Sequence, residues 1–218
     1  RMLITVLLDT SSSMNQRTST NISLLDAAKA AIELMLQRFP NERAVKFMLV
    51  TTRNGGTVEA GWKDSHAAFV QKVKMAIARD NSDLGGGLRC CFDLLARERG
   101  FSDIDEYGQG RKPWDSKEGA AVWLLSDGCE LSTQLGVQPS LVLPKGEQNG
   151  GDVFMDAFRW DTRVWVTVLR LPGCGSVPIE WANNLGPAAE FAEKTGGRTQ
   201  VATNIRGLMG AVESLSAR

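Results

Sequence analysis

Three stretches of the chain are apolar without alternation, which is typical of strands buried on both faces of a parallel sheet. They are Met2–Leu8, residues 120–125 and residues 163–171. Shorter strands are predicted at residues 44–51, Thr57–Ala60 and residues 198–201. Asn54-Gly55-Gly56 lies between the first two of these and predicts a hairpin turn, because such residues adopt positive φ angles readily.

Between the strands, apolar residues recur at helical spacing. The first helix is predicted to begin after Ser23, a residue type that caps helix N-termini, and to end before Pro40. Its apolar face would be formed by Leu25, Ala28, Ile32, Met35 and Phe39.

A second helix is predicted after Ser65, with Phe69, Val73 and Ile77 at fourfold spacing on its buried face. Further helices are predicted at residues 85–99, 187–194 and 204–215. The stretch from 128 to 160 is expected to be irregular, and within it residues 145–152 are rich in polar residues and glycine.

This alternation of strands and helices predicts an α/β fold with a doubly wound, mostly parallel sheet flanked by helices. A chain of 218 residues can bury one substantial core, so residues 2–218 are expected to form a single domain. Arg1 is expected to be a remnant in front of the natural start, Met2.

The composition narrows the possible partners. The chain has 25 basic and 25 acidic residues, so no basic excess favours direct binding to nucleic acid or to an anionic membrane. No apolar run approaches the roughly 20 residues that span a bilayer. Cys90, Cys91, Cys129 and Cys174 lack the spacing of a zinc site and favour a reducing compartment.

Two of the apolar runs are followed by aspartates, Asp9 and Asp127, and the first continues into a segment that contains Ser11 and Ser13. The carboxyl ends of parallel strands meet at one edge of a sheet, where functional sites gather. Carboxylate and hydroxyl oxygens suit hard cations. These four residues therefore predict a site for Mg²⁺, or for Mn²⁺ or Ca²⁺.

The same residues resemble a known domain family. Asp9-Thr10-Ser11-Ser12-Ser13 matches the DxSxS motif of von Willebrand factor A (VWA) domains, and Leu125-Ser126-Asp127-Gly128 matches their later aspartate motif. The resemblance implies a Rossmann-like fold with a metal-ion-dependent adhesion site (MIDAS) whose fifth ligand is a loop threonine. By register Ser82 replaces that threonine. Asp83 adds a carboxylate whose orientation the sequence leaves open.

Four segments spread over most of the chain resemble the amino-terminal domain of the Integrator complex subunit 6 family. They are residues 9–18, 60–63, 107–111 and 158–161. That resemblance implies a domain excised from a longer nuclear scaffold. The expected partners are other Integrator subunits and protein phosphatase 2A, in small nuclear RNA 3′ end processing and transcription attenuation. An acidic side chain of a partner would complete the metal shell.

Two other interpretations compete with this one. Strand-end Asp and Ser residues also cap helices and satisfy loop amides without any metal. Asp9 would alternatively serve a Mg²⁺-dependent phosphatase or hydrolase, but Ser11 stands where such enzymes carry a second aspartate, and His66 is the only histidine. We therefore predict a non-catalytic interaction domain. Trp114 and Trp160, which lie near loops, are candidate partner-binding residues.

Overall fold

The computed structural model describes residues 2–41, 44–79, 83–101, 119–128, 130–132, 136–138, 162–174 and 192–216. Its main feature is a six-stranded sheet in the order β3-β2-β1-β4-β7-β8. Only β3 is antiparallel to its neighbour. The strands are β1 (Met2–Leu8), β2 (Val45–Thr51), β3 (Thr57–Ala60), β4 (Gly119–Ser126), β7 (Thr162–Leu169) and β8 (Thr199–Ala202).

The sheet is doubly wound, as predicted. The chain first builds outward from β1 to β2 and β3, and then returns to build β4, β7 and β8 on the other side of β1. The strand order therefore reverses between β1 and β4, whose registers pair Leu8 with Leu125. Ligand sites of open α/β sheets lie outside the carboxyl ends of the strands at this switch point.

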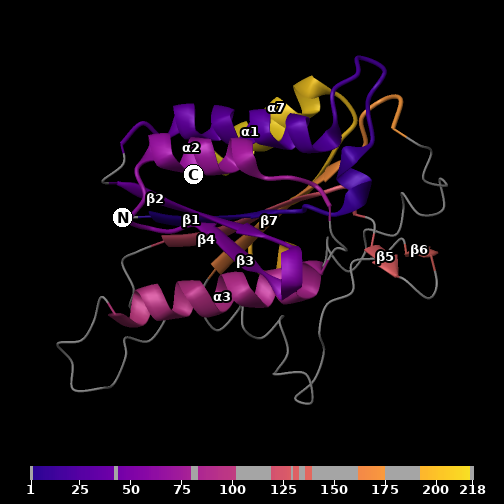
Figure 1. The fold of residues 1–218 in the computed structure, drawn as a ribbon. Helices are drawn as coiled ribbons and strands as arrows, with labels where there is room; N and C mark the ends of the chain where they lie inside the picture. The colour runs from indigo at the N-terminus through magenta and orange to yellow at the C-terminus, as the bar shows by residue number, and fades with distance from the viewer. Residues whose placement is uncertain are drawn as a thin grey trace.

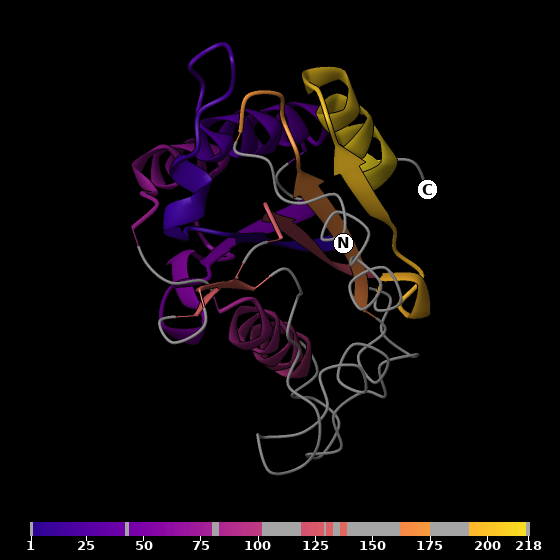
Figure 2. The same cartoon turned by 90° about the vertical axis from the view of Figure 1, so that its right-hand side faces the viewer.

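Helices cover both faces of the sheet (Figures 1 and 2). Helices α1 (Leu24–Arg38), α2 (His66–Met75) and α7 (Ile205–Ser216) lie on one face, and α3 (Leu84–Phe101) lies on the other. Each face has its own buried apolar cluster. Trp123 is fully buried in the first cluster, where its Nε1 donates to Thr167 Oγ1 at 2.9 Å. Trp165 is also buried, and both lie in apolar runs that are predicted to form buried strands.

The predicted helix starts are confirmed at two serines. Ser23 Oγ accepts a hydrogen bond from Asp26 N, and Ser65 Oγ accepts one from Ala68 N. Helix α3 begins at Leu84, so the glycines that follow it form the first turn of that helix. The hairpin prediction also holds, because Asn54 and Gly55 have φ angles of 52° and 73° before β3 returns along β2.

The prediction for the end of the second helix is wrong. Helix α2 ends at Met75, and Ile77, predicted to be on the buried face, is 55% exposed beyond it. The physical reason is a set of tertiary hydrogen bonds that replace helical ones. Arg79 N donates to Thr10 O at 3.0 Å, and Asn15 Nδ2 donates to Ala78 O at 2.7 Å.

Part of the stretch predicted to be irregular forms a small hairpin of β5 (Glu130–Ser132) and β6 (Gly136–Gln138). Of the helix predicted at 187–194, only 192–194 lies within the described residues, and these three are helical. Within the described part of the chain, no helix is both long enough and apolar enough to cross a bilayer.

Candidate metal centre

Asp9 and Asp127 lie at the carboxyl ends of adjacent strands. Asp9 follows β1, and its backbone N–H donates to Leu125 O of β4 at 2.9 Å. Asp127 directly follows β4. Both side chains are buried. The structure therefore brings the two predicted carboxylates to the switch point of the sheet.

The Asp9 carboxylate is held by hydrogen bonds to both of its oxygens. Oδ1 accepts from Ser11 N at 2.9 Å and from Thr52 Oγ1 at 3.3 Å, and Oδ2 accepts from Ser126 Oγ at 2.6 Å. Two of these donors are themselves oriented by backbone amides, because Thr10 N donates to Thr52 Oγ1 and Gly128 N to Ser126 Oγ. The orientation of the carboxylate is thus fixed by three separate stretches of chain.

Sequence reasoning missed Thr52 and Ser126. Each stands at the carboxyl end of a strand that flanks β1, Thr52 just after β2 and Ser126 as the last residue of β4. A signal was present, since hydroxyl residues occur at all three strand ends. Their role depends on strand order and register, which the sequence alone does not give.

The two predicted serine ligands are also brought together. Ser11 Oγ and Ser13 Oγ lie 2.9 Å apart, Ser11 being buried and Ser13 half-buried. The short 3₁₀ helix η1 (Ser12–Asn15) turns the chain so that alternate residues of the loop approach one another. Because Ser11 N also donates to Asp9, the hydroxyl pair and the carboxylate belong to one local arrangement.

The electrostatics of this edge are unfavourable to two bare carboxylates. Burial, and then the neighbouring charge of Asp127, raise the pKa of Asp9 to about 6, although hydrogen bonds from Ser126 and Ser11 lower it. Buried like charges disfavour ionisation of both groups. A cation placed between them would remove that penalty.

The residues present fit such a cation. Among the described residues, no group of three or more His, Cys, Asp or Glu side chains gathers as a metal cluster, so this edge offers two carboxylates and neutral hydroxyls. Mg²⁺ is commonly bound by one or two carboxylates while it keeps several waters. Asp9, Asp127, Ser11 and Ser13 would hold the ion, and it would supply an electrophilic centre for a further oxygen ligand.

Three predicted residues, Ser82, Trp114 and Trp160, lie outside the described residues. Asp83, whose orientation the sequence left open, has an exposed side chain whose Oδ1 accepts from Gly86 N at 2.8 Å. It therefore caps the start of α3.

Two features considered for a hydrolase, a histidine and an aspartate two residues after Asp9, are not found beside Asp9 in the described part of the chain. His66 lies at the start of α2 with its ring 5.2 Å from that of Phe47, centroid to centroid. Phe47 pairs with Ile4, well before the strand end that carries Asp9. The position two residues after Asp9 is Ser11, whose hydroxyl lies against Ser13.

Comparison with known proteins agrees with this geometry. Residues 4–130 match the von Willebrand factor type A domain model. The chain is 38% identical over 98% of its length to Integrator complex subunit 6 of Homo sapiens and to the Integrator complex subunit 6 homolog of Dictyostelium discoideum. It spans only 25% and 20% of those two proteins. The predicted resemblance to the subunit 6 family is thus confirmed.

Solved structures show the same fold at low sequence identity. BatB from Bacteroides thetaiotaomicron aligns with a TM-score of 0.62 at 13% identity, covering 99% of this chain and 98% of that one. The SpRpn10 VWA domain aligns with a TM-score of 0.56 at 13% identity, covering 96% and 93%. Sequence match, topology and strand-end residues agree, and the chain belongs to the von Willebrand factor type A domain family.

Proposed function

We propose that this chain is a non-catalytic protein-interaction domain that binds a divalent cation at the β1/β4 edge. Asp9, Ser11, Ser13 and Asp127 hold the ion, directly or through water, with Ser82 as a fifth ligand. Mg²⁺ is the first choice, and Mn²⁺ or Ca²⁺ would suit the same oxygen ligands. A carboxylate from a partner protein fills the remaining coordination position.

The observation that carries this proposal is the state of Asp9. Its carboxylate is fully buried, is fixed by donors from three stretches of chain, and shares the edge with a second buried carboxylate. Loop capping satisfies the oxygens of Asp9 but leaves two like charges buried at one edge, which disfavours ionisation of both groups. A bound cation would offset this repulsion.

The relatives suggest where such a domain acts. Proteins named Integrator complex subunit 6 share 38% identity with nearly the whole of this chain. We infer a scaffold role in a nuclear Integrator complex, through contacts with other Integrator subunits. Within that complex, the domain is proposed to recruit protein phosphatase 2A. It is also proposed to take part in small nuclear RNA 3′ end processing and transcription attenuation.

Calorimetric titration of the chain with Mg²⁺ and Mn²⁺ tests the ion, and co-purification with Integrator subunits and phosphatase 2A tests the partners. Asp9→Asn should abolish the ion's heat signal and weaken co-purification. Asp93→Asn is the matched control, because Asp93 is an exposed carboxylate within α3 and is not one of the proposed ligands. If Asp9→Asn and Asp93→Asn behave alike in both measurements, the proposal is wrong.

The competing hydrolase function is tested on the same samples. A phosphatase assay with Mg²⁺ should show no turnover that depends on Asp9. Turnover by the unmodified chain that disappears in Asp9→Asn and persists in Asp93→Asn would favour the enzyme.

A further inference from the structure

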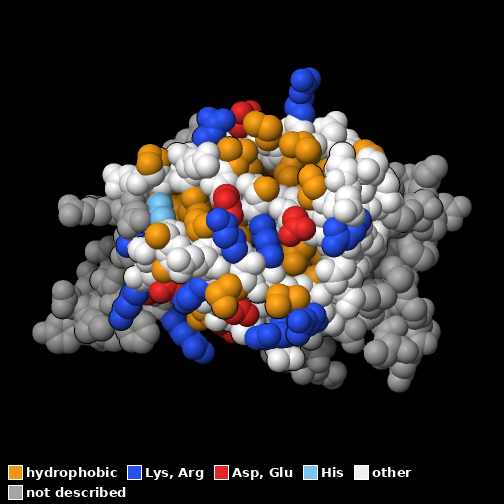
Figure 3. Space-filling view, turned by 45° about the horizontal axis from the view of Figure 1, so that its top comes forward, with side chains coloured by type: hydrophobic (Ala, Val, Ile, Leu, Met, Phe, Trp, Pro, Cys, Tyr) orange, Lys and Arg blue, Asp and Glu red, His pale blue; other side chains and the backbone are white. Residues whose placement is uncertain are grey.

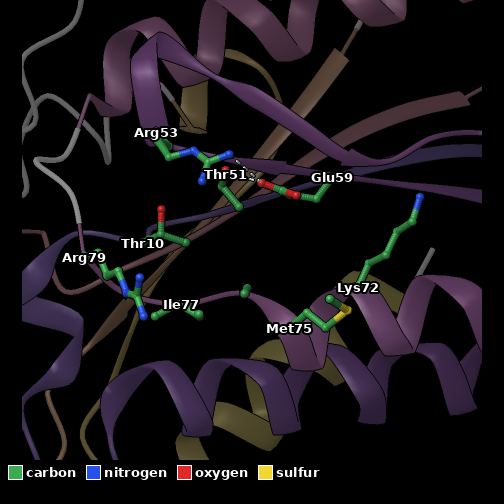
Figure 4. Close-up of a pocket in the computed structure, with 9 residues that line it drawn as sticks. Thr10, Thr51, Arg53, Glu59, Lys72, Met75, Ile77 and Arg79 are labelled. Carbon is green, nitrogen blue, oxygen red and sulfur yellow. Dashed lines mark hydrogen bonds and ion pairs between the residues drawn. The ribbon is translucent and has the colours of Figure 1, made fainter.

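A groove of about 390 Å³ opens beside the candidate metal site, between the carboxyl end of β2, the antiparallel strand β3 and the end of α2 (Figure 4). Its size is in the range of pockets that hold small ligands or a few side chains. Nine residues line it: Thr10, Thr51, Arg53, Glu59, Lys72, Met75, Ala76, Ile77 and Arg79.

One side of the groove is apolar and open to solvent. Met75 is 76% exposed and Ile77 is 55% exposed, and Ala76 lies between them. Exposed apolar side chains that lie together mark interaction surfaces more often than single exposed apolar side chains do. Figure 3 shows hydrophobic side chains exposed beside Lys and Arg on the face that carries α1, α2 and α7.

The charged lining of the groove is mainly basic. It contains three basic residues, Arg53, Lys72 and Arg79, and one acidic residue, Glu59, whereas the whole chain has no net charge. Arg53 lies 3.6 Å from Glu59, and Lys72 lies 3.0 Å from Asp64. Arg79 is exposed and has no ion pair within the described residues. An acidic ligand would therefore gain favourable interactions without first separating Arg79 from an ion-pair partner among the described residues.

The wall that carries these residues is held in place by hydrogen bonds. Besides the bonds from Arg79 N and Asn15 Nδ2, Ser12 Oγ donates to Arg79 O at 3.1 Å, and Lys29 Nζ donates to Lys74 O at 3.0 Å. The groove is thus largely formed before any ligand arrives, which lowers the entropic cost of binding.

The groove and the metal edge share one loop. Arg79 is hydrogen-bonded to the backbone of Thr10, and Thr10 directly follows Asp9 and lines the groove. A segment bound in the groove at Thr10 would therefore lie next to the strand end that carries Asp9, where the proposed ion would bind.

We propose that this groove binds a segment of a partner protein that is rich in Asp and Glu and carries a large apolar side chain. The acidic side chains pair with Arg79 and Arg53, and the apolar side chain packs on Met75 and Ile77. The inference deepens the proposed function, on which it rests for the choice of a protein segment as ligand. The groove contacts themselves need no ion.

A random library of displayed peptides of about a dozen residues, selected on the unmodified chain in EDTA, tests the groove without metal. The recovered peptides should be acidic with at least one large apolar residue. Arg79→Glu should weaken peptide binding by about tenfold or more, because it reverses a charge that contacts the ligand. The loss should be larger at low salt than at high salt, because salt screens the interaction. Ile77→Ser should weaken binding several-fold through lost apolar contact.

The chain offers matched controls on α7. Arg206 is exposed and without an ion pair in the described part of the chain, and Ile205 is 61% exposed. Arg206→Glu and Ile205→Ser should leave peptide binding unchanged, and thermal unfolding should show that all four variants are folded.

The proposal is overturned if no peptide is selected, if the selected peptides are basic, or if the groove variants bind like the controls. Calorimetry with Mg²⁺ separates this result from the metal site. Groove-dependent binding in EDTA together with no Mg²⁺ binding would refute the metal site and support the groove. Mg²⁺ binding without groove-dependent peptides would refute the groove alone.

Discussion

The candidate metal site (Asp9, Ser11, Ser13 and Asp127) and the groove meet at Thr10, which follows Asp9 and lines the groove, yet the two are built in opposite ways. At the edge, Asp9 and Asp127 are buried and Asp9 is fixed by three side-chain and backbone donors. In the groove, Arg79 and Ile77 are exposed. Burial of the two carboxylates lowers the stability of the folded state through lost hydration, whereas the solvated side chains of the groove have little such cost.

Because of this difference, substitutions at the two places should separate effects on stability from effects on binding. Changes at the edge should alter the free energy of unfolding and the affinity for the ion together. Changes in the groove should alter partner affinity with little effect on unfolding. Two of the three predictions that follow concern the buried edge, and the third compares an exposed position in the groove with a buried one.

The largest effect should come from pH in the metal-free chain. The pKa of Asp9 is about 6 in the folded state against 3.8 for a free side chain, so the folded state binds the proton more tightly. The contribution of protonated Asp9 to the free energy of unfolding is fully present below pH 3.8 and is lost as pH rises through about 6. The loss should total roughly 2–3 kcal/mol.

Denaturant unfolding in EDTA at a series of pH values measures this loss. In Asp9→Asn, which cannot titrate, the free energy of unfolding should lose this dependence on pH. Saturating Mg²⁺ should remove the same dependence in the unmodified chain. A profile that is the same in the variant and in the parent would show that Asp9 is not the titrating group.

Removing a donor to Asp9 should have the next largest effect. Ser126→Ala deletes the 2.6 Å hydrogen bond to Asp9 Oδ2 and the acceptor of Gly128 N, so it should lower the free energy of unfolding by roughly 2 kcal/mol. Ser214→Ala serves as control, because within the described residues Ser214 Oγ donates to Ala211 O of the same helix, α7. Equal destabilisation by the two variants in chemical unfolding would contradict the special role of Ser126.

The smallest effect is expected at the groove. Ile77→Ala should change the free energy of unfolding by less than about 0.5 kcal/mol, because the side chain is already solvated. Val73→Ala, four residues earlier and fully buried, should cost about 2 kcal/mol. Similar costs at the two positions would mean that Ile77 is packed in the core, as the sequence pattern alone predicts.

The fold was largely predictable because its signals are local and repeated. Unbroken apolar runs marked β1, β4 and β7, and Ser23 and Ser65 marked helix starts. Four site residues, Asp9, Ser11, Ser13 and Asp127, could be placed together for the same reason, because parallel strands bring their carboxyl ends to one edge.

The remaining features depend on tertiary contacts. Thr52 and Ser126 become donors to Asp9 only once the order and register of β2, β1 and β4 are known. Ile77 keeps the helical spacing, but hydrogen bonds between residues 78–79 and the loop at 10–15 draw the chain away from the helix. The groove results from that departure, so no sequence pattern could have predicted it.

The central claim is that Asp9 and Asp127 hold one ion together with Ser11 and Ser13. Crystals grown with Mn²⁺ test it most directly, through an anomalous difference map. The account predicts a single peak at the β1/β4 edge, about 2–2.5 Å from ligand oxygens or one water away from them. A map without a peak at that edge, or with the only peak elsewhere on the domain, would contradict it.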